Sequence, residues 1–157
     1  MSEENNYFIS SRGLLKSCDY FSQSAHSSIK QLINYPRLDM IRNMKNPIIY
    51  ICSSAIPHFI QVLLPTINFK FILVSGDSDE TIPNEIFKQQ DNLNKFINDE
   101  KLVHWFCQNM TVTHPKITII PIGLDYHTMN TNPIWGGIVS SLDQEKILNS
   151  IIKNSKP

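Results

Sequence analysis

Four short, mostly apolar runs recur along the chain, and polar residues or glycine follow within two positions of the end of each. They lie at residues 47–52, 69–74, 102–106 and 117–122. The apolar positions of residues 47–52 are continuous rather than alternating, which is typical of a strand covered on both faces, as in a parallel sheet. Residues 7–10 form a shorter β-prone run that ends at Arg12-Gly13, and we predict a first strand there.

Between the strands, apolar residues recur at helical spacing. This spacing predicts helices at residues 22–34, 38–43, 55–64, 84–96 and 141–153. The last helix begins with Ser141-Leu142-Asp143-Gln144, which matches a Ser-x-x-Gln capping box. Strands that alternate with helices indicate an α/β fold with a mostly parallel, Rossmann-like sheet and helices on both faces.

The length of 157 residues fits a single domain over residues 1–157. Its motif-bearing core is expected at residues 48–128, followed by the C-terminal helix at 141–153. The chain contains no Gly-x-Gly-x-x-Gly, P-loop or Gly-x-Ser-x-Gly motif, so the common dinucleotide, nucleotide and hydrolase signatures do not apply.

The composition narrows the class of partner and the compartment. Lys plus Arg and Asp plus Glu number 14 each, and no basic run is present, which argues against nucleic acid as a partner. The longest apolar runs fall far short of the roughly 20 residues that a membrane-spanning helix needs. Cys18, Cys52 and Cys107 lie far apart without zinc-ligand spacing. We therefore expect a soluble protein of a reducing compartment: the cytoplasm, or the host cytoplasm or virion if the source is viral.

Ligands of parallel α/β sheets bind beyond the carboxyl ends of the strands, so the residues that follow each strand are the candidates for chemistry. The strand at 69–74 leads into Ser75-Gly76-Asp77-Ser78-Asp79-Glu80. Asp77 and Asp79 could hold a divalent cation against a diphosphate. The alternative is an Asp-rich turn whose side chains bond their own backbone.

The last strand leads into Gly123-Leu124-Asp125-Tyr126-His127. Gly123 permits a sharp turn or a close approach of the backbone. Asp125 could orient His127 as a general base. Two neighbouring polar residues in a loop equally need no catalytic explanation.

Polar residues near the strand at 102–106 complete the candidate set. Asn109 follows that strand and could bind a sugar hydroxyl or cap a turn. His114 and Lys116 flank Pro115. A cation in this loop could meet a phosphate or a carboxylate, and the alternative is a turn with solvated polar groups.

Four segments together resemble exostosin-like glycosyltransferases of large DNA viruses, bacteria and protists. They are residues 71–79 (FILVSGDSD), 105–109 (WFCQN), 114–116 (HPK) and 120–128 (IPIGLDYHT). The resemblance implies a GT-B-like architecture of two Rossmann-like lobes, in which the C-terminal lobe holds most of the nucleotide sugar. This chain would correspond to the N-terminal lobe alone, which contributes acceptor contacts and the base.

The resemblance implies transfer of a sugar from a nucleotide-sugar donor to a glycan or other hydroxyl acceptor, with a second lobe or subunit as partner. Asp79 or Asp125 would be the catalytic base. The substrate-binding residues would be Asp77, Glu80, Asn109, His114, Lys116, Gly123 and His127. The resemblance assigns no cofactor, and binding of a divalent cation stays an open alternative.

Two other classes of function stay open at this point. The first is a non-catalytic binding or structural module, such as a virion-associated protein that reuses the fold. The second is a metal-dependent hydrolase that uses Asp77, Asp79 and His127.

Overall fold

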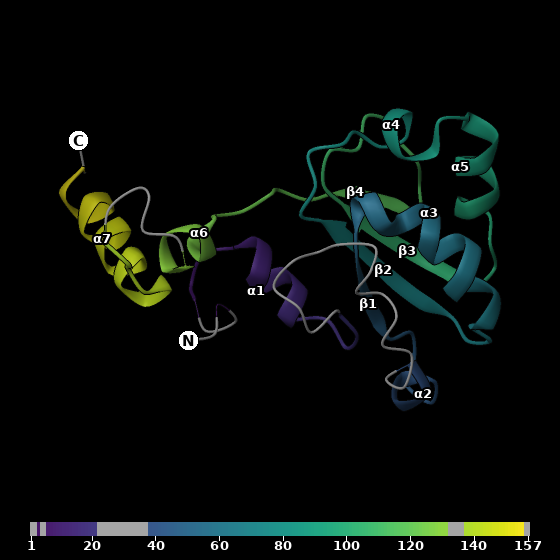
Figure 1. Cartoon of the computed structure of the whole chain (residues 1–157), viewed down its shortest axis with the longest axis horizontal. Helices are drawn as coiled ribbons and strands as arrows, with labels where there is room; N and C mark the ends of the chain where they lie inside the picture. The colour runs from purple at the N-terminus through teal and green to yellow at the C-terminus, as the bar shows by residue number, and fades with distance from the viewer. Residues whose placement is uncertain (1–2, 4–5, 22–37, 132–136, 156–157) are drawn as a thin grey trace. The chain divides into compact units, whose positions relative to one another are not determined.

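The computed structural model describes the chain except residues 1–2, 4–5, 22–37, 132–136 and 156–157 (Figure 1). The chain divides into two compact units. The terminal unit comprises Met1–Ser17 and Ile122–Pro157, and the sheet unit comprises Cys18–Pro121. The expectation of a single domain over residues 1–157 stays a prediction.

A four-stranded, all-parallel sheet forms the centre of the sheet unit. Its strands lie side by side in chain order: β1 (Ile48–Cys52), β2 (Phe71–Gly76), β3 (Leu102–Cys107) and β4 (Ile117–Ile119). The four mostly apolar runs are therefore neighbouring strands, and the predicted α/β fold with a parallel sheet is confirmed.

Two of the strand predictions need correction. The strand predicted at 117–122 ends at Ile119. Ile120 still donates its N–H to the carbonyl of Cys107 (2.9 Å), but β3 then turns away at Asn109, whose φ is 54°. The strand predicted at 7–10 is wrong. Ser10 forms only an isolated bridge with Leu124, and a helix begins at the next residue.

Helices cover one face of the sheet (Figure 1). They are α3 (Ile56–His58), a π-helical turn that continues it (Phe59–Leu63), α4 (Asn84–Phe87) and α5 (Gln90–Ile97). Phe59 meets Phe71 of β2 edge to face, with ring centroids 5.8 Å apart. Phe87 and Phe96 lie 6.2 and 5.4 Å from Trp105 of β3. This aromatic layer is the centre of the hydrophobic core.

The helix predicted at 55–64 forms over that range, with 3₁₀ turns at both ends (Ser53–Ala55 and Leu64–Thr66). The helix predicted at 84–96 is instead split in two. Lys88 adopts a left-handed backbone with a φ of 58° and separates α4 from α5. The split allows Phe87 and Phe96 to stack on each other, 6.0 Å apart, while both contact Trp105.

The other helices near the sheet are only partly described. Helix α2 spans Leu38–Ile41 and is shorter than the predicted 38–43. The helix predicted at 22–34 lies outside the described residues, so helices on the second face of the sheet stay a prediction. No described helix is long and apolar enough to cross a membrane. Cys18, Cys52 and Cys107 are buried thiols, without a disulfide among them.

The described residues of the terminal unit form helices α1 (Ser11–Lys16), α6 (Tyr126–Thr131) and α7 (Ser141–Asn154). The capping box predicted at Ser141 is displaced by one residue. Ser140 is the N-cap of α7, and its hydroxyl accepts the N–H of Asp143 (3.2 Å). Gln144 reaches across the unit, because its amide nitrogen donates to the carbonyl of Tyr126 (2.9 Å).

Glu145 of α7 ties the segments of the terminal unit together. Its buried carboxylate accepts the N–H of Phe8 (3.0 Å) and the hydroxyl of Tyr126 (3.2 Å). Burial raises the pKa of Glu145, but the hydrogen bonds that it accepts lower the pKa by more, so the net shift is downward. Burial and the charge of Glu145 in turn raise the pKa of Tyr126 to about 12.

We expect the terminal unit to lose stability in acid through Glu145. A carboxyl with a depressed folded-state pKa contributes stability above its unfolded-state pKa of roughly 4.3, and this contribution is lost as the pH falls through the folded-state pKa. Amide hydrogen exchange of α7, measured between about pH 3 and pH 7, should show this loss. Glu145→Gln should weaken protection at neutral pH and flatten the pH dependence. Glu100→Gln, at an exposed position of the sheet unit, should leave both unchanged. Equal acid sensitivity in Glu145→Gln would contradict this role.

Candidate functional site

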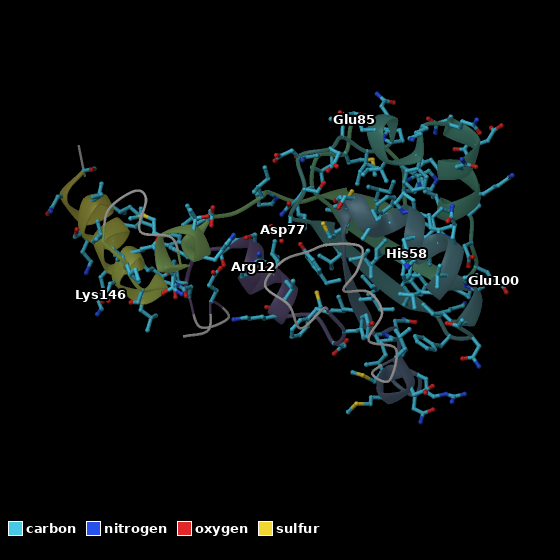
Figure 2. The ribbon with its side chains drawn as sticks, viewed as in Figure 1. Arg12, His58, Asp77, Glu85, Glu100 and Lys146 are labelled. Carbon is cyan, nitrogen blue, oxygen red and sulfur yellow. The ribbon has the colours of Figure 1, made fainter. Side chains whose placement is uncertain are left out.

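The carboxyl ends of the strands lie at one edge of the sheet because all four strands are parallel. Asp77 follows β2 at this edge, whereas Glu100, which precedes β3, lies at the opposite edge (Figure 2). We call the loops that follow β1, β2 and β3 the carboxyl edge. It is the usual place for ligands in folds of this class.

Gln108 is the residue that holds the carboxyl edge together. It is 2% exposed, and its side-chain oxygen accepts the N–H of Asp77 (3.1 Å). Its amide nitrogen donates to the carbonyl of Pro121 (3.3 Å), and its own N–H donates to the carbonyl of Ser75 (3.1 Å). One buried side chain therefore connects the exits of β2, β3 and β4.

Because Gly76 has no side chain, the amide of Gln108 can occupy the space beside its Cα. A Cβ at position 76 would lie 2.4 Å from the side-chain oxygen of Gln108. A side chain at residue 76 would therefore force the buried, hydrogen-bonded amide of Gln108 to move. This explains the glycine immediately before the acidic loop.

The acidic loop, residues 77–80, is also bound to the next strand. Asp77 and Asn109 adopt left-handed backbones, with φ of 56° and 54°, which Asp and Asn tolerate better than most residues. The side-chain amide of Asn109 donates to the carbonyl of Ser78 (2.9 Å). The Ser78 hydroxyl donates to Glu80. Asn109 and Glu80 therefore stabilise the loop.

Asp79 differs from the other members of the acidic loop. It is exposed, and its carboxylate makes no hydrogen bond or ion pair with any residue that the structure describes. The loop thus has a backbone fixed on both sides and one carboxylate that faces solvent.

Cys52 ends β1 at the same edge, and its thiol donates to the carbonyl of Asp77 (3.3 Å). Burial raises the pKa of the Cys52 thiol, and the nearby charges of Asp77 and Glu80 act in the same direction. A hydrogen bond with Ser54 opposes these effects but does not reverse them. The thiol stays protonated at neutral pH and supports the loop rather than acting as a nucleophile.

Two of the expected substrate-binding residues lie elsewhere in the sheet unit. Lys116 precedes β4, and its ammonium donates to the carbonyls of Ile97 (3.0 Å) and Asp99 (3.3 Å) at the end of α5. A ring nitrogen of His114 accepts the N–H of Lys116 (3.1 Å). Residues that enter a parallel strand lie at the edge opposite those that leave one, so the structure does not bring His114 and Lys116 to Asp79.

The other three expected residues belong to the terminal unit. Gly123 has a φ of 81°, and a Cβ there would lie 2.7 Å from the carbonyl oxygen of Ile9. Asp125 precedes α6, and its carboxylate accepts both the N–H (3.0 Å) and the hydroxyl (2.6 Å) of Thr128. His127 Nδ1 lies 2.9 Å from an oxygen of Asp125.

These contacts affect the basicity of Asp125. Partial burial raises its pKa, but the hydrogen bonds from Thr128 and the charges of His127 and Arg12 lower it by more, so the net shift is downward. A carboxylate with a depressed pKa is a weaker base. Asp125 therefore serves α6 as a helix cap.

Sequence reasoning missed Gln108 and Cys52, although both stand where a strand ends. The position was a usable signal: each is the last residue of its strand or the first one after it. No group of three or more His, Cys, Asp or Glu residues that could hold a metal ion occurs within the described part of the chain. None of the three cavities found among the described residues, of 240, 360 and 170 Å³, is lined by a residue of the acidic loop.

The fold and the carboxyl edge define the class of this chain as an α/β protein with an all-parallel sheet. Comparison with protein-family models, curated proteins and solved structures finds no match. The resemblance to exostosin-like glycosyltransferases therefore stays a prediction.

Proposed function

We propose that the chain is a glycosyltransferase-like domain that transfers a sugar from a nucleotide-sugar donor to a hydroxyl acceptor, with Asp79 as the base. The observation that supports this most is the solvent-facing carboxylate of Asp79. It lies on a loop that Gln108 and Asn109 hold in place. A general base must be accessible to the substrate hydroxyl, and it must be held in position.

Asp79 meets these requirements better than Asp125. Asp125 has both oxygens engaged by Thr128 and a depressed pKa. Asp79 is exposed at the edge where ligands of parallel α/β sheets bind. We therefore assign the base to Asp79 and a structural role to Asp125.

In the proposed reaction, the acceptor hydroxyl gives its proton to the carboxylate of Asp79. The acceptor oxygen forms a bond to the anomeric carbon of the sugar. The bond between that carbon and the donor's diphosphate breaks, and its electron pair leaves with the nucleoside diphosphate. A second lobe or subunit would hold most of the nucleotide, while Asp77 and Glu80 would shape the acceptor side.

Asp79→Asn should lower sugar transfer by about 10²- to 10⁴-fold, the range that a general base contributes. Donor affinity should stay unchanged, because the substitution keeps the size of the side chain. The measurement is isothermal titration with UDP- and GDP-sugars, followed by transfer assays on glycan acceptors. Glu100→Gln is the matched control, since it removes an exposed carboxylate from the opposite edge of the sheet.

An unchanged rate of sugar transfer in Asp79→Asn would show that Asp79 is not the base. Absence of binding with every nucleotide sugar and every glycan acceptor would favour the other class, a non-catalytic binding or structural module, because the proposal gives this chain the acceptor side of the site. Loss of transfer in Glu100→Gln as well would indicate a general effect of charge rather than a role for Asp79.

A further inference from the structure

We propose that the sheet unit carries a second site, distinct from the carboxyl edge, that binds a small monocarboxylate with an apolar body. The site is a cavity of 360 Å³ between the helical segment that follows β1 and helices α4 and α5. Small-molecule pockets usually range from about 300 to 1,000 Å³, so the cavity suits a small ligand. We call it the helix pocket.

The base of the helix pocket is apolar. Buried side chains from three segments form it: Leu64, Ile86, Phe87 and Phe96. Phe87 and Phe96 stack on each other and contact Trp105 on the inner side. These rings are held by the core, so the base of the pocket exists without a ligand and favours an apolar group.

One wall of the helix pocket comes from the π-helical turn Phe59–Leu63, which supplies Ile60 and Gln61. A π-helical turn places one more residue in the turn than an α-helix does, and such turns occur frequently at functional sites. The turn is an observation independent of the cavity itself, and it points to the same place.

The rim of the helix pocket carries an unpaired positive charge. Lys95 is exposed and makes no hydrogen bond or ion pair with any described residue. Asp99, the acidic residue of the lining, is already engaged: it accepts the N–H of Lys101 (2.8 Å) and lies 3.9 Å from its ammonium. The positive charge of Lys95 is therefore available to a ligand, and it favours an anion over a neutral molecule.

Two neutral polar side chains complete the rim. Gln61 and Asn92 line the pocket, and their amides make no hydrogen bond within the described part of the chain. They can donate to a carboxylate oxygen that Lys95 attracts. An apolar base with a cation and two amide donors at its mouth matches an aliphatic or aromatic monocarboxylate.

The test uses 4-phenylbutyrate and its neutral analogue 4-phenylbutanol, titrated into the full chain and followed by ¹H–¹⁵N NMR. We expect 4-phenylbutyrate to shift the side-chain amide signals of Gln61 and Asn92. Lys95→Gln should weaken 4-phenylbutyrate about tenfold, the equivalent of one modest charged hydrogen bond, and leave 4-phenylbutanol unaffected. Lys70→Gln, which removes an exposed lysine outside the lining, should change neither affinity.

A second variant tests the site without relying on Lys95. Ile60→Glu adds a negative charge to the wall at a partly exposed position, and it should abolish binding of 4-phenylbutyrate. Undiminished binding in Ile60→Glu, or equal weakening of both ligands in Lys95→Gln, would overturn the proposal. Absence of amide shifts with either ligand would overturn it as well. None of these outcomes depends on sugar transfer.

Discussion

Replacing Trp105 with alanine is expected to lower the free energy of unfolding of the sheet unit by about 3–5 kcal/mol, the usual cost of truncating a buried aromatic residue. Trp105 is 0% exposed and contacts both Phe87 and Phe96. Its indole N–H donates to the hydroxyl of Ser75 (2.9 Å), one residue before Gly76. The substitution would remove the ring that the helix layer packs on and leave a cavity beneath the helix pocket.

Urea unfolding followed by circular dichroism measures this effect. Trp105→Phe is the informative control, because it keeps an aromatic ring in the core while it removes the donor to Ser75 and part of the ring volume. Its loss should be smaller, about 1–2 kcal/mol for one buried hydrogen bond and slightly altered packing. A loss below about 1 kcal/mol in Trp105→Ala would contradict the central place of this ring in the core.

Replacing Gly123 with alanine should disrupt the contact between the two segments of the terminal unit, Met1–Ser17 and Ile122–Pro157. The left-handed backbone of Gly123 alone would cost alanine roughly 1–2 kcal/mol. The new Cβ would also lie 2.7 Å from the carbonyl oxygen of Ile9 and 2.9 Å from the Cα of Ser10. Both atoms are backbone, so the chain itself must move. The hydrogen bond from the N–H of Leu124 to Ile9 (2.8 Å) should be lost.

The exchange rate of the Leu124 amide hydrogen reports this change directly, and it should rise in Gly123→Ala. Gly137→Ala is the matched control, since nothing lies within 4 Å of a Cβ at that position. An unchanged Leu124 exchange rate in Gly123→Ala would show that the close approach to Ile9 is dispensable. Sequence reasoning assigned Gly123 to substrate binding, and the packing against Ile9 and Ser10 is a sufficient physical reason for this glycine.

The sequence positions of Asp125 and Lys116 already indicated structural roles, although the sequence analysis assigned both residues to a ligand site. Asp125 and Thr128 are three residues apart, the spacing of a helix cap, and the structure uses them in that way. Lys116 precedes a predicted strand, and this alone places it opposite the residues that leave the strands. In both cases polar residue types suggested a ligand, whereas position along the element determines which edge or helix end they serve.

The sequence by itself determined the four strands of the sheet and the class of fold. Apolar runs of strand length predict the strands of a parallel sheet, and this signal is local, so it survives without knowledge of the partners. It also determined that Asp77, Asp79 and Asn109 would lie at one edge, because parallel strands all end on the same side.

Only the tertiary structure decided how that edge is built. Gln108 connects Asp77 to Pro121, and Gly76 makes room for its amide, through contacts that span up to 31 positions of the chain. Likewise, Phe87 and Phe96 lie on separate helices, on either side of the break at Lys88, and both contact Trp105. Such contacts have no local pattern, since each depends on residues that become neighbours only when the sheet has formed.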